Sequence, residues 1–258
     1  MHRARKRFGQ NFLQDQGIIH AIVRLINPSL GMHIIEIGPG LGALTRPLLS
    51  NLTQLDLLEI DRDLVAYWQH ENLLGLKIIK GDALKFNFEE WAQQRAEHSS
   101  LCKVVGNLPY NISSPLLFHL VSAAPYIDEQ VFMLQAEVVE RMVAPAGSSD
   151  FSRLSVMLQA RYDMELALEV PPEAFEPAPK VNSAVVRMIP KRSFNLNDAQ
   201  WNALEQVVAA AFSQRRKMLR TNLQAFAGKL KLSDEELKAR AQDISVDRYI
   251  EWAKVLAS

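Results

Sequence analysis

The feature that most constrains the fold is an alternation of short apolar runs with segments of helical periodicity. Runs rich in β-branched residues and leucine lie at 33–37, 55–60, 77–81, 103–107 and 130–135, and a helical pattern follows each run. Strands that alternate with helices in this way form a parallel sheet whose faces are covered by the helices. We therefore predict an α/β fold.

The pattern changes toward the C-terminus. Two strand-like runs, 164–170 and 184–190, are joined by a proline-rich segment, which indicates an antiparallel addition to the sheet. Beyond residue 192 the remaining patterns are all helical, and they cover residues 199–227, 233–242 and 246–257. Asp198 and Ser233 stand where N-caps are expected. We predict a Rossmann-like domain over residues 1–192 and an all-helical domain over residues 193–258.

Composition excludes several classes of protein. The single cysteine, Cys102, rules out an internal disulfide framework and suits the reducing cytoplasm. The six histidines are scattered, so we expect no metal site. No apolar stretch approaches the roughly 20 residues that span a bilayer. A polar segment follows the basic N-terminus, which argues against a signal peptide; a mitochondrial presequence fits less well, because the basic part is short and contains no serine. We expect a cytoplasmic monomer.

Basic residues gather in two places although the formal net charge is zero. A chain can present a basic face to nucleic acid and balance that charge elsewhere. Two solvated faces without a partner explain the pattern equally well. The clusters comprise Arg3, Arg5, Lys6 and Arg7 near the N-terminus, and Arg215, Arg216, Lys217 and Arg220 in the helical region.

A glycine-rich segment, "EIGPGLGALT" at residues 36–45, follows the first strand. We expect Gly38 and Gly40 to let the backbone approach a ligand at the opening of a helix, whose N-terminus favours an anionic group. Glu59 closes the second strand, where a carboxylate accepts both hydroxyls of a ribose. Asp82 follows the third strand and is placed to accept from an adenine amino group. Together these residues predict a nucleoside pocket.

The same segment leaves three interpretations open. Gly38 and Gly40 satisfy the loose dinucleotide fingerprint, and Glu59 has the spacing of about 20 residues expected of a nicotinamide enzyme. An S-adenosylmethionine enzyme needs the same ribose and adenine contacts without a pyrophosphate. A glycine-rich turn that binds nothing is the third.

The segment "NLPY" after the fourth strand favours the methyl donor. The exocyclic amine of adenine is a poor nucleophile because its lone pair is delocalised into the ring. The Asn107 carboxamide oxygen and the Leu108 carbonyl offer two acceptors for the amine N–H groups, which would free the lone pair. Pro109 fixes the local backbone, and Tyr110 offers a flat face for the base. The segment supplies no acid or base of the kind that hydride transfer usually needs.

With these residues in view, the chain resembles the ribosomal RNA adenine N6-dimethyltransferase family. Within it, the closest likeness is to bacterial members that modify two adjacent adenosines near the 3′ end of small-subunit ribosomal RNA. The antibiotic-resistance methylases of large-subunit RNA share "NLPY"-like loops, and a mitochondrial transcription-factor relative matches less well. The resemblance covers nearly the whole chain and rests on "RKRFGQNFL", "EIGPGLGALT", "EID", "GDAL", "GNLPYNIS", "LQAEVVERM", "PKVNSAVV" and "AFSQRRKMLRTNL".

The resemblance implies a set of roles. S-adenosylmethionine would be the cofactor, and small-subunit ribosomal RNA in an assembling subunit would be the substrate. Asn11 and Leu13 would join Gly38, Glu59, Asp82 and Asn107 around the cofactor. Phe175 is our candidate for a second aromatic face opposite Tyr110, although a hydrophobic plug under the proline-rich loop is an equal alternative. RNA contacts are expected from Arg5, Lys6, Arg7, Arg215, Arg216, Lys217 and Arg220. A nicotinamide-dependent dehydrogenase and a non-catalytic ribosome-assembly factor remain the alternatives.

Overall fold

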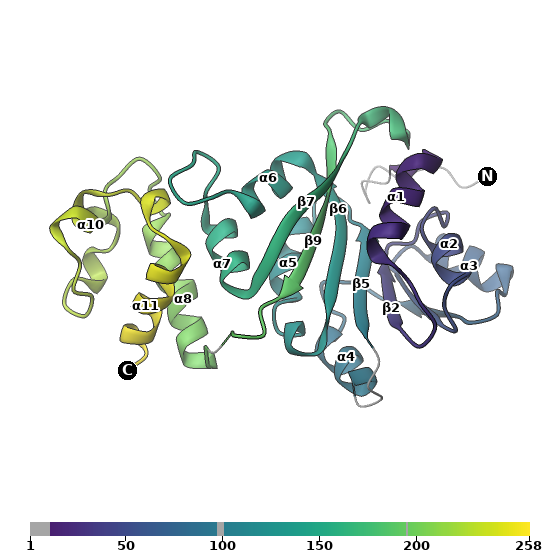
Figure 1. Ribbon diagram of the computed structural model, residues 1–258, viewed down its shortest axis with the longest axis horizontal. Coiled ribbons are helices and arrows are strands. Elements are labelled where there is room, and N and C mark those ends of the chain that lie inside the picture. The colour runs from purple at the N-terminus through teal and green to yellow at the C-terminus, as the bar shows by residue number, and fades with distance from the viewer. Residues whose placement is uncertain (1–10, 97–100, 195) are drawn as a thin grey trace. The chain divides into compact units, whose positions relative to one another are not determined.

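A computed structural model describes residues 11–96, 101–194 and 196–258 (Figure 1). The described chain divides into two compact units. The first runs to Val139 and resumes over Glu165–Pro190, and the second comprises Glu140–Met164 and Lys191–Ser258. The division at Pro190 lies two residues before the predicted boundary, and residues 140–164 group with the C-terminal helices.

The first unit contains the predicted sheet. Its strand order is β4-β3-β2-β5-β6-β9-β7, and the neighbours from β4 to β6 pair in parallel. All five predicted parallel strands are confirmed to within a residue or so at each end. They are β2 (His33–Ile37), β3 (Leu55–Glu59), β4 (Leu76–Lys80), β5 (Cys102–Asn107) and β6 (Glu129–Gln135).

The antiparallel addition is also confirmed. Strand β9 (Ser183–Pro190) pairs antiparallel with β6, with Gln135 opposite Ser183, and β7 (Tyr162–Val170) lies beyond it at the sheet edge. The sequence did not predict the small second sheet. Its strands β1 (Phe12–Leu13) and β8 (Phe175–Glu176) are antiparallel and bring Leu13 opposite Phe175.

Helix α1 (Gln16–Ile26) covers part of the sheet. Asp15 caps its N-terminus by accepting from the Ile18 N–H at 2.9 Å. Its apolar stripe, Ile19, Ile22 and Ile26, is buried in one cluster with side chains from β2, β3, β5, β6 and β9. The other helical elements that lie wholly or partly in the first unit are α2 (Thr45–Leu49), α3 (Arg62–Glu71), α4 (Phe88–Ala96), α5 (Ser113–His119), η2 (Ala124–Tyr126), α6 (Ala136–Val143) and η3 (Pro172–Ala174).

A buried ion network joins α1 to the sheet at the amino ends of the strands. The Lys103 ammonium lies 2.5 Å from the Glu129 carboxylate and donates to the Ile26 carbonyl at 2.6 Å. Arg187 on β9 pairs with the same carboxylate. Because each buried charge has a partner, the desolvation cost is offset, and the end of α1 is fixed against β5 and β6.

The second unit is helical, with corrections to the predicted boundaries. Helix α8 is capped by Asn197 instead of Asp198, and the predicted helix 199–227 breaks after Ala211. Ser233 is confirmed as an N-cap, and α7 was not predicted. The elements are α7 (Arg153–Arg161), α8 (Asp198–Ala211), α9 (Leu219–Asn222), η4 (Gln224–Phe226), α10 (Asp234–Lys238), η5 (Ala241–Asp243) and α11 (Val246–Leu256).

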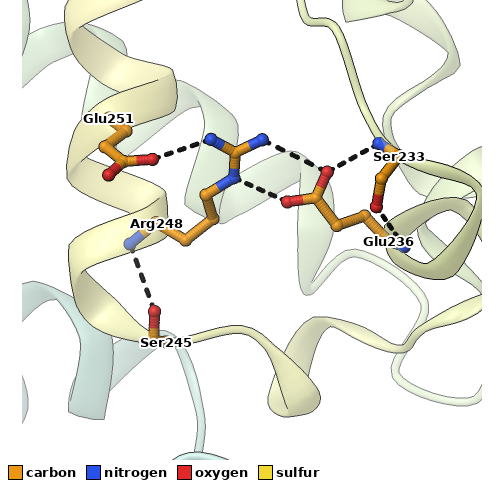
Figure 2. Close-up of polar contacts among 5 residues, drawn as sticks. All are labelled: Ser233, Glu236, Ser245, Arg248 and Glu251. Carbon is orange, nitrogen blue, oxygen red and sulfur yellow. Dashed lines mark hydrogen bonds and ion pairs between the residues drawn. The ribbon is translucent and has the colours of Figure 1, made fainter.

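An arginine-centred cluster holds α10 against α11 (Figure 2). The Arg248 guanidinium donates to both oxygens of Glu236, at 2.6 and 3.2 Å, and to Glu251 at 2.7 Å. Glu236 also accepts from the Ser233 N–H at 2.7 Å, which completes a capping box. The hydrogen bonds from Arg248 lower the pKa of Glu236. One charged pair therefore supports both the cap of α10 and its attachment to α11.

Candidate active site

A cavity of about 680 Å³ lies at the carboxyl ends of β2, β3, β4 and β5. This is the edge at which open α/β sheets bind ligands, and the volume suits a small-molecule site. The lining includes all the predicted cofactor residues and the four residues of "NLPY". They are Asn11, Leu13, Gly38, Gly40, Glu59, Asp82, Asn107, Leu108, Pro109 and Tyr110.

The glycine segment forms one wall and requires glycine at particular positions. Gly38, Gly40 and Gly42 have φ angles of 65, 56 and 94°, which favour glycine. A Cβ on Gly42 would lie 2.5 Å from the Trp68 ring, and the Trp68 Nε1–H donates to the Gly40 carbonyl at 3.0 Å. Helix α2 begins at Thr45, three residues after Gly42. Its N-cap Leu44 and its residues Arg46 and Pro47 also line the cavity, so the glycine backbone and the start of α2 form this wall together.

Two carboxylates flank the cavity where the sequence predicted them. Glu59 ends β3 and is 5% exposed, and its Oε1 accepts from the Asp61 N–H at 2.8 Å. Burial raises the pKa of Glu59, while backbone hydrogen bonds from Asp61, Ile60 and Gly40 oppose that rise. Asp82 follows β4, and its Oδ1 accepts from the Leu84 N–H at 3.0 Å. Both carboxylates are therefore held by the backbone that follows them.

A third carboxylate, Glu36, lines the cavity and was not among the predicted site residues. It is 2% exposed on β2 and accepts from the Thr45 hydroxyl at 2.7 Å. Burial raises the pKa of Glu36 to about 7; the Thr45 hydrogen bond lowers it, and the nearby Glu59 charge adds to the rise. An acid within the apolar run "HIIEI" was the available signal, since an unpaired charge in a buried strand needs a reason.

The loop after β5 is tied down on several sides. Asn107, the last residue of β5, donates through Nδ2 to the Asn11 carbonyl at 3.2 Å. This bond orients the carboxamide, because its nitrogen and oxygen point in different directions. The Leu108 N–H donates to the Met133 carbonyl at 3.0 Å. The Pro109 carbonyl accepts from the Ile112 N–H and the Ser113 hydroxyl, each at 3.1 Å.

Tyr110 is half-buried at the cavity wall, and its hydroxyl lies 2.8 Å from the Ser183 Oγ. Burial raises the pKa of the Tyr110 phenol, and the bond with Ser183 partly opposes the rise. The phenol is therefore neutral at physiological pH and available for a hydrogen bond.

Phe175 is placed differently from the other predicted catalytic residues. It is 4% exposed and packs in the hydrophobic core with Ala174 and Leu13. It does not belong to the described lining of the cavity. Its strand, β8, instead supports Leu13, which does line the cavity.

The predicted RNA-binding residues fall into two groups. Arg5, Lys6 and Arg7 lie outside the described residues. Arg215, Arg216 and Lys217 occupy the turn after α8, Arg220 lies on α9, and all four are exposed in the second unit. Asn222 fixes this turn, because its Nδ2 donates to the carbonyls of Ala211 at 2.6 Å and Gln214 at 3.1 Å.

Neither a metal site nor a membrane span is found in the described part of the chain. No group of three or more histidine, cysteine, aspartate or glutamate side chains there could hold an ion. None of the described helices is long and apolar enough to cross a bilayer.

Comparison with known proteins decides the family. The family model of ribosomal RNA adenine dimethylases matches residues 1–258. The chain belongs to this family. The Ribosomal RNA small subunit methyltransferase A of Burkholderia pseudomallei is 51% identical over 263 residues, which span 100% of this chain and 95% of that relative. The protein of the same name from Bordetella petrii is 51% identical over 99% of this chain and 96% of its own length.

Solved structures confirm the fold. A dimethyladenosine transferase from Plasmodium falciparum superimposes with a TM-score of 0.78 at 24% identity, over 93% of this chain and 95% of its own. The 23S rRNA methyltransferase ErmE superimposes with a TM-score of 0.69 at 22% identity, over 96% of this chain and 100% of its own. The predicted Rossmann-like methyltransferase fold is confirmed. Family membership also confirms the prediction of an RNA adenine methyltransferase and sets aside the dehydrogenase and the non-catalytic factor.

Proposed function

We propose that the cavity holds S-adenosylmethionine and that the loop Asn107–Tyr110 presents the target adenine beside it. The enzyme dimethylates adenines of small-subunit ribosomal RNA, in keeping with its family and relatives. We further infer that its targets are two adjacent adenosines in the 3′-terminal hairpin loop of 16S RNA. The protein would act as a cytoplasmic monomer on a subunit that is still assembling. The observation that carries the proposal is one cavity lined by two nucleoside-type carboxylates and an orientated carboxamide.

The cofactor contacts follow from the chemistry of the wall. Glu59 would accept the two ribose hydroxyls, and Asp82 would accept from the adenine amino group. Gly38 and Gly40 leave room for the ligand against the backbone, and Asn11 and Leu13 would close the other side. S-adenosylmethionine supplies an electrophilic methyl group when it is bound.

The target amine would be activated by two acceptors. The Asn107 Oδ1 and the Leu108 carbonyl would each accept one N–H of the adenine amine, which favours a tetrahedral nitrogen with a free lone pair. The bond from Asn107 Nδ2 to Asn11 supports this role, because it commits the nitrogen and leaves the oxygen as the acceptor. No general base is required, since the product ammonium loses its proton readily to water.

The base would stack on Tyr110 after leaving the RNA helix. Unstacking costs a few kcal/mol, and one aromatic face returns about 1–3 kcal/mol. A second face is therefore expected, and we keep Phe175 for this role. Since Phe175 is buried in the core, its part in stacking requires β8 to shift when RNA binds.

Phosphates would be bound by the basic residues. Arg215, Arg216, Lys217 and Arg220 are exposed, as phosphate contacts must be. Arg5, Lys6 and Arg7 would add contacts from the N-terminal segment.

The function is tested by mass spectrometry of small-subunit RNA from a strain that lacks this protein. We expect unmethylated adenosines at two adjacent positions, and full dimethylation after purified enzyme and S-adenosylmethionine are added to the immature subunits. Dimethylation that persists in the deletion strain would contradict the proposal.

A further inference from the structure

A buried serine contacts the side chain on which the target base is proposed to stack. Ser183 is the first residue of β9 and is 1% exposed. Its hydroxyl lies 2.8 Å from the hydroxyl of Tyr110, 73 residues earlier in the chain. The pairing of Ser183 with Gln135 fixes its backbone at the end of the β6–β9 ladder. The serine is thus a rigid point on the sheet.

The loop that carries Tyr110 is already held by its backbone. Leu108 is bonded to β6 through Met133, and the Pro109 carbonyl receives two donors from the start of α5. These contacts fix the Cα of Tyr110 but leave its two side-chain torsions free. The bond to Ser183 holds the hydroxyl at the far end of the ring. Because that oxygen lies on the axis of the second torsion, the bond restrains the first torsion and so fixes where the ring lies.

We propose that Ser183 is a positioning residue that sets where the Tyr110 ring lies for stacking with the target adenine. The inference rests on the proposed function of Tyr110. A base leaves the RNA helix at a cost of a few kcal/mol, so a face that is already in place avoids a further loss of side-chain entropy on binding. The ordinary alternative is that Ser183 and Tyr110 merely satisfy each other's buried hydroxyls.

The two interpretations differ in their kinetic consequences. Ser183→Ala leaves the aromatic ring of Tyr110 in the protein but removes the hydrogen bond that restrains it. Tyr110→Phe removes the same hydrogen bond by deleting the phenol hydroxyl. One neutral hydrogen bond corresponds to about a three- to tenfold change in an equilibrium constant. We expect each variant to raise the KM for immature small subunits by about that factor. Tyr110→Ala removes the face itself and should raise the KM further.

The decisive experiment is a double-mutant cycle. If the two hydroxyls act as one unit, Ser183→Ala combined with Tyr110→Phe is no worse than either single variant. If instead the rise in KM of the double variant equals the product of the rises in the two single variants, the proposal is overturned. Asn182→Ala is the matched control, because Asn182 is the exposed neighbour whose backbone carbonyl, not its side chain, accepts from Ala136. Affinity for S-adenosylhomocysteine and thermal unfolding, measured on every variant, identify a general loss of structure.

A spectroscopic readout separates failure of this inference from failure of the proposed function. With 13C-labelled tyrosine, the Tyr110 ring resonance is identified by its absence in Tyr110→Phe, and Ser183→Ala is expected to shift it. If Ser183→Ala leaves the Tyr110 resonance unchanged, the two side chains are not in contact and the inference is overturned. The stacking role of Tyr110 is unaffected by that result. A Tyr110→Ala variant with wild-type KM removes the stacking role itself, and the inference with it.

Discussion

The cavity of the first unit and the basic turn of the second unit are built in opposite ways. Around the cavity, functional groups lie at or near strand ends and are buried or half-buried. Each is held by a neighbour, as Glu36 is by Thr45 and Asn107 by Asn11. In the basic turn the charged groups are exposed, and the hydrogen bonds from Asn222 hold only the backbone. Chemistry at a nitrogen atom needs fixed positions, whereas attraction to phosphates falls off slowly with distance and needs only charge.

The comparison predicts that substitutions at the cavity wall change stability or cofactor affinity, whereas substitutions in the basic turn leave stability nearly unchanged. The largest effect is expected for Gly42→Ala. The new Cβ combines an unfavourable φ of 94° with a clash against the Trp68 ring. Strain and overpacking together should lower the free energy of unfolding by about 3–4 kcal/mol.

Chemical denaturation measures this loss, and Gly31→Ala is its control. Gly31 has a similar φ of 85°, but no atom lies within 4 Å of its added Cβ. We expect about 1 kcal/mol for Gly31→Ala. Equal losses in the two variants would show that packing at the glycine wall is not tight.

The second prediction concerns Glu36 and pH. Burial raises its pKa to about 7 from 4.5, so the native state favours the protonated form. The stability that this preference contributes is fully present below about pH 4.5 and is lost as the pH rises through about 7, by about 3 kcal/mol. Glu36→Gln keeps an acceptor for Thr45 and cannot ionise. Its stability relative to the wild type should therefore rise across this window, as urea unfolding at a series of pH values would show. A constant difference between the two proteins would mean that Glu36 does not titrate there.

The third largest effect is expected for Glu59→Ala, which should weaken cofactor binding. Removing a charged hydrogen-bond partner costs about 1.5–3 kcal/mol, so the Kd for S-adenosylhomocysteine should rise at least tenfold by calorimetry. Glu89→Ala, at an exposed position of α4, is the control. Unchanged affinity in Glu59→Ala would make Glu59 an ordinary strand-end residue.

The smallest effect on stability is expected in the basic turn. Neutralising the four exposed residues from Arg215 to Arg220 should change the free energy of unfolding by about 0.5 kcal/mol or less per substitution. The same variant should bind RNA with a flatter salt dependence, because each lost phosphate contact lowers the slope by about one. An unaltered salt dependence of RNA binding would show that these residues form a solvated face that does not contact phosphates.

The sequence predicted the parts of the fold that depend on local patterns. β-Branched runs marked the strands, and residues that end parallel strands, such as Glu59 and Asn107, share one edge for geometric reasons. The pairing of β1 with β8 had no such signal, since each strand has two residues and they are far apart in the chain. The burial of Phe175 follows from that pairing and was equally hidden.

The break in the helix after Ala211 shows the same limit. Helical periodicity continues through Phe212, but tertiary contacts override it. The Phe212 ring stacks on Tyr249, with centroids 6.1 Å apart. The Asn222 side chain donates a hydrogen bond to the Ala211 carbonyl. Glu36 was missed although an acid within an apolar run is a signal, because a single acid carries no periodicity and its burial is defined only by the folded chain.

The acceptor role of Asn107 is the central claim, and single-turnover methyl transfer by Asn107→Ala tests it most directly. The assay uses immature small subunits and S-adenosylmethionine, with the Kd for S-adenosylhomocysteine measured in parallel and Asn182→Ala as the control. Loss of one preorganised polar contact to a reacting group slows chemistry by about 10²–10³-fold. We predict a rate reduced by that factor, with a smaller loss of cofactor affinity. Transfer at the wild-type rate would contradict the account.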